Sequence, residues 1–243
     1  TALSAGWAWD IPLTNRTGNG YVYSSAYLSR EQAEQELRAH LGVLDSDSEA
    51  RHLSMRVGQR QQHWAKNCLA VGLSQGFIEP LEATALHLAQ VTLQSFIECL
   101  INGRTSSADQ ANFNQQISAR FDGVRDYIVC HYKVSSRSDT DYWRDNASNP
   151  NVSKSLAAVL SAWDAGEDLS LEIERQGIGQ YYSVISWHCL LGGYGRFPGI
   201  NDELKDDPKC VQFPLTEVQA FNRRCALNFS LHESQLSSLV SSL

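Results

Sequence analysis

The stretch NCLAVGLSQGFIEPLEATALHLAQ, residues 67–90, carries the strongest local signals in the chain. It opens with an apolar run at residues 68–71, which predicts a buried strand. Two glycines, Gly72 and Gly76, then break the run and predict a turn.

A helix is expected to follow this turn. Pro80 suits a first helical turn, and the acidic residues Glu79 and Glu82 complement the positive end of the helix dipole. A core-facing stripe is expected from the apolar residues at 81, 85, 88, 89, 93 and 96. A strand, a glycine turn and a helix N-terminus together present free backbone N–H groups to an anion or to the electron-rich edge of a cofactor.

The segments on either side of this stretch differ in character. Upstream, alternating apolar residues predict strands at 7–11, 20–26, 51–57 and 59–64, and a helix capped by Ser29 is predicted to reach Leu41. Downstream, a polar linker at 102–109 is followed by helical periodicity, which predicts helices at 111–132, 152–163 and 216–243. The expected fold class is α+β: residues 1–102 hold the strands and the key helix at 80–100, and residues 103–243 are mostly helical.

Composition and charge exclude several classes of function. The 243 residues are 42% hydrophobic, which suffices for a sizeable core, and carry a formal net charge of -7. A nucleic-acid binder would need a clustered basic surface, and no apolar run approaches the roughly 20 residues of a membrane span. The six cysteines lack CxxC spacing, so free thiols in a reducing cytoplasm are expected and a metal site is not. His87 and His131 are both expected to be structural residues.

Four segments carry a resemblance to a known family. GFIEPLEATALH at 76–87 and WAWDIP at 7–12 are the most specific, and GNGYVYSS at 18–25 and HYKVSSRSDTDYW at 131–143 agree with them. In this order they resemble the second half of flavin-dependent tryptophan halogenases, from about residue 6 to about residue 200. The resemblance implies the C-terminal part of a flavin monooxygenase-like FAD-binding fold, with a mixed sheet and the key helix, followed by the helical section.

The resemblance implies a role for each matching residue. Reduced FAD from a separate flavin reductase, together with O₂, would oxidise chloride or bromide to a hypohalous acid that halogenates an electron-rich aromatic ring. Glu82 matches the active-site glutamate, proposed to orient the oxidant and to take the proton from the ring. Thr84 and Ala85 match the positions whose backbone amides hold the halide. The residues implied to lie beside the flavin are Trp7, Trp9, Ile11, Pro12, Gly76, Phe77 and Pro80. From the residues alone, the two tryptophans would be core aromatics on a strand.

Two departures from the family pattern bear on the site. Ala83 stands where the family has a serine, which removes a hydroxyl from the site. Tyr181, Tyr182 and Trp187 match substrate-binding positions, but residues 183–198 contain no Asp or Glu to hold an ammonium group. An indole without the amino-acid part, or a phenol, is therefore expected in preference to free tryptophan.

The 243 residues contain no GxGxxG turn for the pyrophosphate of FAD. An N-terminal half with that turn and with the family's lysine is therefore expected upstream of Thr1, and the chain alone is expected to be inactive. Two alternatives stay open: a related flavin monooxygenase that hydroxylates its substrate, and a truncated chain that only binds a partner. The expected partners are the flavin reductase, an aromatic small molecule and the missing half, and a homodimer is allowed; nucleic acid and membrane are not expected.

Overall fold

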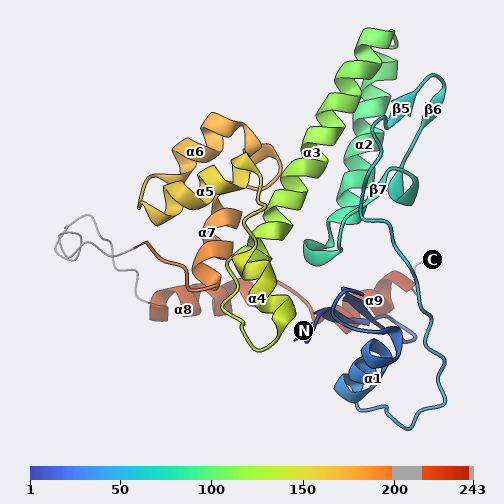
Figure 1. The fold of residues 1–243 in the computed structure, drawn as a ribbon, viewed down its shortest axis with the longest axis vertical. Coiled ribbons are helices and arrows are strands. Elements are labelled where there is room, and N and C mark those ends of the chain that lie inside the picture. Colours follow the sequence, from blue (N-terminus) through green and yellow to red (C-terminus); the bar gives the residue numbers. More distant parts are fainter. Residues whose placement is uncertain (199–214, 241–243) are drawn as a thin grey trace, which may run out of the picture. The chain divides into compact units, whose positions relative to one another are not determined.

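Two long helices, α2 (Thr84–Ile101) and α3 (Ser107–Lys133), run side by side in opposite directions through the first of two units (Figure 1). This computed structural model describes residues 1–198 and 215–240, and the two units are Thr1–Pro198 and Gly199–Leu243.

Helix α3 forms where the sequence predicts a helix, because its signals are local. Ser106 caps the N-terminus in a capping box with Asp109. Apolar side chains then recur at helical spacing and form one side of the main core. The buried apolar residues of this face are Phe113, Ile117, Phe121, Val124 and Ile128.

Helix α2 turns a different face to the core from the predicted one. Ala85 and Leu93 of the predicted stripe are exposed. Thr92 is 1% exposed because its hydroxyl is satisfied, accepting from Gln75 Nε2 at 2.5 Å and donating to the Leu88 carbonyl at 2.8 Å. Tertiary hydrogen bonds therefore let a partly polar row face the core. The buried residues of α2 are Thr84, Leu88, Thr92 and Cys99.

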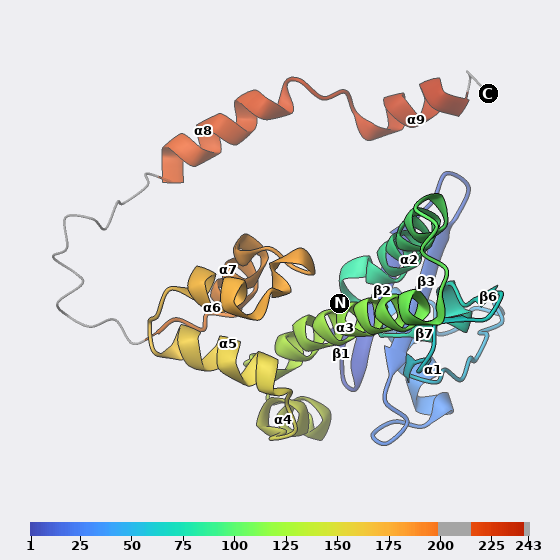
Figure 2. The same cartoon turned by 90° about the horizontal axis from the view of Figure 1, so that it is seen from above.

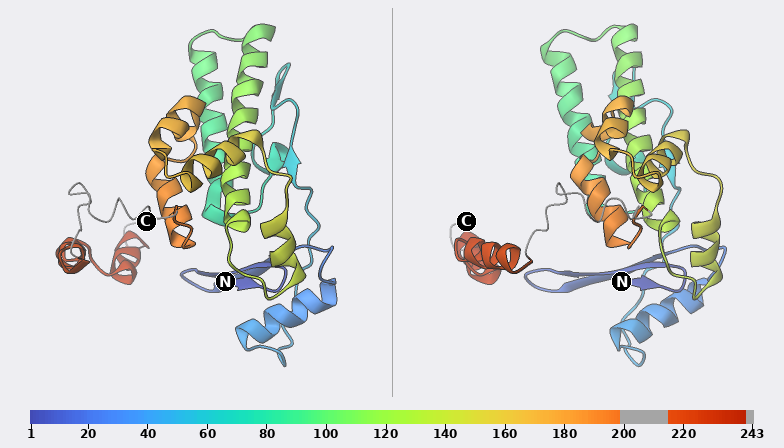
Figure 3. Two further views of the ribbon diagram at one scale, coloured as in Figure 1. Left: turned by 60° about the vertical axis from the view of Figure 1, so that its left-hand side comes forward. Right: turned by 90° about the vertical axis from the view of Figure 1, so that its left-hand side faces the viewer.

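An antiparallel ribbon of three strands forms the N-terminal part, as the alternating pattern predicts. The strands are β1 (Ala2–Leu3), β2 (Gly6–Pro12) and β3 (Thr17–Tyr23), in that order. Trp9 pairs with Gly20, where a Cβ atom would come within 2.2 Å of the Trp9 ring, so the glycine lets the indole lie across the strand. Figure 3 shows the ribbon crossing the end of the α2–α3 pair, with α1 (Arg30–Leu41) on its other face. The Ser29 cap of α1 is confirmed.

The strands predicted between residues 51 and 71 are mostly wrong. Residues 51–57 have no regular secondary structure, and Cys68 of the expected buried strand is exposed. Only two-residue strands occur, with β4 pairing antiparallel to β7 and β5 to β6. Their bounds are β4 (Gly58–Gln59), β5 (Trp64–Ala65), β6 (Cys68–Leu69) and β7 (Gly76–Phe77). Here a side chain of α3, and not a neighbouring strand, accepts two backbone hydrogen bonds. Asn114 Oδ1 accepts from the His63 and Trp64 amides at 2.7 and 2.8 Å.

Four shorter helices complete the first unit. They are α4 (Asp141–Ser148), α5 (Lys154–Asp164), α6 (Leu169–Gln176) and α7 (Val184–Gly193). Figure 2 shows α5, α6 and α7 grouped on one side of α3 and the strands on the other. This group has its own apolar core, which Tyr127 and Cys130 of α3 join to the main helix pair.

The described part of the second unit contains α8 (Leu215–Ala226) and α9 (His232–Val240). The single helix predicted at 216–243 is therefore divided by a break at residues 227–231, and residues 241–243 lie outside the described part.

The α+β class is confirmed, whereas every strand pairing in the described residues is antiparallel rather than mixed. The predicted boundary between sections 1–102 and 103–243 falls between α2 and α3, within the first unit, whereas the two observed units divide after Pro198. Among the described residues, no helix is both long enough and apolar enough to cross a membrane.

Candidate functional site

A strained turn precedes α2. Glu82 and Ala83 have φ angles of 67° and 53°, in the left-handed region that residues with a Cβ atom rarely adopt. The turn is a 3-10 helix, Leu81–Ala83, closed by a 3.0 Å hydrogen bond from the Ala83 amide to the Pro80 carbonyl. Each such residue costs on the order of 1–3 kcal/mol, and such strain tends to cluster at functional sites. The turn is therefore the first structural pointer to a site.

The carboxylate of Glu82 lines a pocket of about 590 Å³. The pocket lies between β2, the strained turn, α3 and one side of α7 along its length. Its lining residues are Trp7, Leu81, Glu82, Tyr127, His131, Ile185, Ser186, Cys189, Leu190, Gly193 and Tyr194. Glu82 is the only carboxylate among them, and its side chain is 42% exposed, so the pocket presents one accessible negative charge.

His131 is the nearest charged or titratable neighbour of this carboxylate in the pocket. Its Nε2 atom lies 3.3 Å from Glu82 Oε1, and its Nδ1 atom lies 3.3 Å from the Tyr194 hydroxyl. The Glu82 contact is close but not aligned as a hydrogen bond, and within the described residues Nε2 has no other partner. Burial lowers the pKa of His131, although the Glu82 charge opposes that shift. A neutral His131 imidazole is the expected state near pH 7.

Tyr127 connects the pocket to one aromatic residue before α7 and one within it. Its ring stacks on Tyr182 with centroids 3.6 Å apart and meets Trp187 edge-on at 5.0 Å. The Tyr182 hydroxyl and the Trp187 Nε1 are buried and have no hydrogen-bond partner in the described part of the chain, and the same holds for Trp7 Nε1. Of these three residues, Trp7 lines the pocket, whereas Tyr182 and Trp187 lie against Tyr127.

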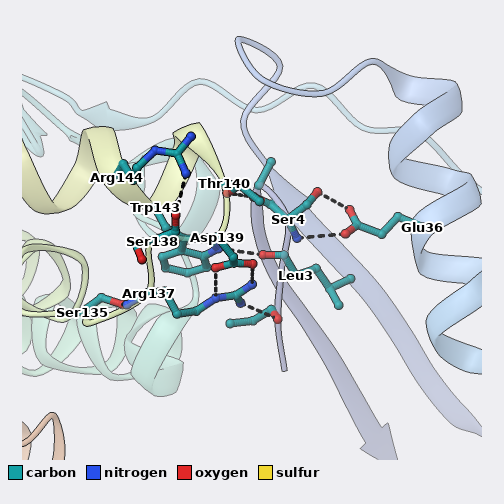
Figure 4. Close-up of polar contacts among 12 residues, drawn as sticks. Leu3, Ser4, Glu36, Ser135, Arg137, Ser138, Asp139, Thr140, Trp143 and Arg144 are labelled. Atoms are coloured by element: carbon teal, nitrogen blue, oxygen red, sulfur yellow. Dashed lines mark hydrogen bonds and ion pairs between the residues drawn. The ribbon is translucent and has the colours of Figure 1, made fainter.

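Hydrogen bonds from the segment before and within α4 hold the backbone of the β1–β2 segment (Figure 4). Trp143 meets the Trp7 ring edge-on at 5.5 Å and donates from Nε1 to the Leu3 carbonyl at 2.8 Å. Thr140 and Arg137 add hydrogen bonds of 2.7 Å each to backbone carbonyls of the β1–β2 segment. This network fixes β2, and therefore Trp7, against the helical part.

The other residues implied to lie beside the flavin are outside this pocket. Trp9 and Ile11 are 36% and 49% exposed, farther along the ribbon. Pro12 is also exposed, at the end of β2. Gly76 and Phe77 form β7, and Pro80 begins the strained turn.

The halide-binding and substrate-binding predictions fall on two regions. Thr84 and Ala85 open α2, so their backbone amides belong to the helix end whose N–H groups lack intrahelical partners. Tyr181 is turned away from the pocket, with the Arg120 guanidinium 5.3 Å over its ring. Tyr182 and Trp187 reach the pocket wall only through Tyr127.

Sequence reasoning missed how His131, Tyr127 and Tyr194 take part. His131 packs against both tyrosines, as a structural residue would, but it also reaches Glu82. One signal was available, because Tyr127 and His131 are four residues apart and so share one face of a helix. His87, in contrast, is exposed on the polar face of α2.

Charged groups that could select a substrate are few. Arg196 pairs with Asp164, with Nε 2.8 Å from Oδ1, and does not line the pocket. Asp202 and Glu203 lie outside the described residues. In the described part of the chain, no group of three or more His, Cys, Asp or Glu side chains is arranged to hold a metal ion.

Comparison with known proteins decides the family. The sequence model of the tryptophan halogenase family matches residues 1–209. The chain belongs to the tryptophan halogenase family. It is 36% identical over 198 residues to the 7-chloro-L-tryptophan 6-halogenase KtzR of Kutzneria sp. (strain 744), covering 80% of this chain and 37% of that protein. It is 40% identical over 163 residues to the tryptophan 6-halogenase SttH of Streptomyces toxytricini, covering 67% of this chain and 31% of SttH.

Solved halogenase structures give the same result. BrvH, a flavin-dependent halogenase from Brevundimonas sp. BAL3, matches 98% of this chain with a TM-score of 0.80 and 36% identity, and 47% of BrvH is covered. A thermophilic tryptophan halogenase, described as from Streptomycin violaceusniger, matches 81% of this chain with a TM-score of 0.73 and 37% identity, and 38% of it is covered. The chain thus spans less than two fifths of the length of the curated relatives it matches.

Proposed function

We propose that this chain supplies the halide side and the substrate side of a flavin-dependent halogenase that acts on an electron-rich aromatic ring such as an indole. The observation that carries the proposal is Glu82, held in a left-handed turn at the start of α2 and facing Trp7 across one pocket. The family membership of the chain supports the reaction class. The portion that binds the FAD pyrophosphate is proposed to lie in the same full-length protein.

The residues present fit a halide and the edge of a flavin. The first amides of α2 form an anion-attracting helix end, and the exposed Trp9 and Ile11 offer a flat apolar edge. When bound, reduced FAD would supply, with O₂, the oxidant that converts chloride or bromide to hypohalous acid. A flavin reductase is the proposed source of the reduced cofactor.

Glu82 is proposed to complete the substitution on the ring. The ring carbon forms a bond to the halogen as the oxygen–halogen bond of the hypohalous acid breaks and its oxygen leaves as hydroxide. The hydrogen on that carbon then leaves as a proton to a Glu82 carboxylate oxygen. A carboxylate at this point also stabilises the positive charge that develops on the ring. His131 is 12% exposed and lies against Glu82, so it limits where the carboxylate can swing.

The proposal is tested with the full-length protein. Purified protein, a flavin reductase, FAD, NADH, bromide and indole are combined, and products are separated by liquid chromatography and identified by mass. Bromoindole that requires protein, bromide and reductase is expected. Hydroxylated indole formed equally well without bromide would favour a hydroxylating monooxygenase instead. FAD binding with neither product would favour a role in binding alone.

A further inference from the structure

The strained turn before α2 is held from both ends by consecutive residues of α3. His131 contacts Glu82 at the C-terminal side of the turn. Tyr132 contacts Glu79 at the N-terminal side, with its hydroxyl oxygen 2.5 Å from both carboxyl oxygens. The left-handed residues Glu82 and Ala83 therefore begin three residues after an anchored Glu79, and left-handed residues persist only where their surroundings hold them.

Tyr132 is well placed to be a rigid anchor. It is 7% exposed, and its ring stacks on Trp143 with centroids 5.7 Å apart and an interplanar angle of 22°. Trp143 is 1% exposed and lies under the Arg137 guanidinium at 4.8 Å. The same Trp143 meets Trp7 edge-on, so one aromatic pair supports both the turn and β2. A shift of this pair would move two walls of the pocket together.

The chemistry of the Glu79 pair is that of an anchor rather than of an exposed reactive acid. Burial raises the pKa of Glu79 and also that of Tyr132. Glu79 does not line the pocket, whereas Glu82, three residues later, does. A partly buried carboxyl group without its hydroxyl partner would be left with an unmet hydrogen bond, which proteins avoid.

We propose that Glu79 and Tyr132 are positioning residues, whose hydrogen bond on the Tyr132–Trp143 stack holds the left-handed turn that aims Glu82 into the pocket. The inference deepens the proposed function and rests on the role proposed there for Glu82. Neither residue touches the substrate. Both act through the backbone of the turn.

The test replaces Tyr132 by phenylalanine in the full-length protein. Tyr132→Phe keeps the ring and its stack and removes only the hydroxyl. Tyr21→Phe is the matched control, because the Tyr21 hydroxyl also bonds a glutamate, Glu36, at 3.0 Å, but on the N-terminal ribbon. Amide hydrogen exchange at Ala83, whose N–H bonds the Pro80 carbonyl within the turn, is expected to speed up about tenfold or more in Tyr132→Phe and to stay unchanged in Tyr21→Phe.

The kinetic arm uses the bromoindole assay. Tyr132→Phe is expected to lower kcat about tenfold while KM for indole changes less than about twofold, because the position of the carboxylate matters in the transition state. Unchanged exchange at Ala83 together with unchanged kcat would overturn the proposal. If the wild-type protein makes no haloindole, the proposed function fails, and the exchange measurement still decides whether the bond holds the turn.

A second pair of variants tests the same hydrogen bond from the Glu79 side, in case Tyr132→Phe does not fold. Glu79→Gln retains a carbonyl that can accept from the Tyr132 hydroxyl, and Glu79→Ala does not. Slow exchange at Ala83 and a near-normal kcat are expected for Glu79→Gln. Fast exchange at Ala83 and a lowered kcat are expected for Glu79→Ala. Equal behaviour of the two Glu79 variants would show that the side-chain bond does not position the turn.

Discussion

Glu82 owes its place to backbone geometry that side chains with a Cβ atom seldom adopt. A helix that began at Pro80 would put Glu82 on the regular helix surface, whereas the left-handed pair at 82 and 83 delays α2 until Thr84. The delay leaves the carboxylate in front of the helix end, beside the first free amides. The Glu82 carboxylate therefore belongs to the turn, and the backbone amides that attract an anion belong to the first residues of α2.

Replacing Glu82 by glutamine tests the role of its charge. The side chain keeps its size and loses its negative charge, so turnover of indole by the full-length protein is expected to fall about a hundredfold or more. Thermal unfolding and FAD binding are expected to stay near the wild-type values. Glu98→Gln, at an exposed position on the polar face of α2, is the matched control and is expected to keep its activity. A near-normal rate for Glu82→Gln would rule out the proposed role.

His131 makes folding stability depend on pH. Burial lowers the pKa of His131 below its usual 6.5. Just below pH 6.5 the imidazole is therefore protonated in the unfolded chain and still neutral in the folded chain. Stability is therefore present above pH 6.5 and is lost as the pH falls below it, by less than about 1.4 kcal/mol per pH unit for one group. The Glu82 carboxylate opposes the shift, and Tyr127 and Tyr194 face the ring uncharged. His63 contributes in the same direction, because burial lowers its pKa too.

The measurement is denaturant unfolding at about pH 7.5 and about pH 5.5. His131→Gln is expected to reduce, without abolishing, the loss of unfolding free energy between the two values. His87→Gln, on an exposed helix face, serves as the control and should unfold with the wild-type dependence. A wild-type pH dependence in His131→Gln would mean that the ring is protonated in the folded protein as well.

At the scale of elements, the packing of α3 against the segment before α7 sets the position of the tyrosine pair. Gly123 of α3 lies against Tyr181, and a Cβ atom at Gly123 would come 2.1 Å from Tyr181 Cδ2. The neighbouring Tyr182 stacks on Tyr127, one helical turn beyond Gly123. The glycine therefore permits the close approach that places Tyr182 against Tyr127, which lines the pocket.

Gly123→Ala is expected to push Tyr181 outward and to drag Tyr182 off Tyr127. The overlap should lower the unfolding free energy by about 1–3 kcal/mol, as overpacking does. In the full-length protein, KM for indole is expected to rise several-fold, with a smaller change in kcat. Gly18→Ala is the control, because a Cβ atom there meets only the Ile11 carbonyl at 3.8 Å. An unchanged KM in Gly123→Ala would show that Tyr182 does not contribute to substrate binding.

Elements with local signals were predictable, and elements that depend on distant partners were not. Helices α1 and α3 begin at Ser29 and Ser106 with capping boxes that the sequence spells out. The apolar run at 68–71 forms only the two-residue strand β6, and the backbone of the adjoining residues His63 and Trp64 is satisfied by Asn114, far along the chain. The Glu82 prediction came from a motif, but the residues that contact Glu82 and Glu79, His131 and Tyr132, lie some 50 residues away, beyond any local pattern.

At the scale of the whole molecule, the charge around the pocket bears on the substrate. A free amino acid brings an ammonium group, and burying that charge without a partner costs several kcal/mol. Glu82 is the one carboxylate among the residues that line the pocket, and the proposed chemistry needs it facing the ring. Arg196, the cation of the segment after α7, is held by Asp164.

The full-length protein is therefore expected to prefer a neutral aromatic over free L-tryptophan. Equimolar indole and L-tryptophan compete in one reaction with reductase, FAD, NADH and bromide, and the two brominated products are quantified by mass. An excess of bromoindole of about tenfold or more is expected, which corresponds to about 1.4 kcal/mol between the two transition states. Predominant bromotryptophan would show that a carboxylate beyond the described pocket closes over the site, and Asp202→Asn and Glu203→Gln would then identify it by abolishing that preference. Equal conversion would show that the ammonium group stays in water, with only the indole ring entering the pocket.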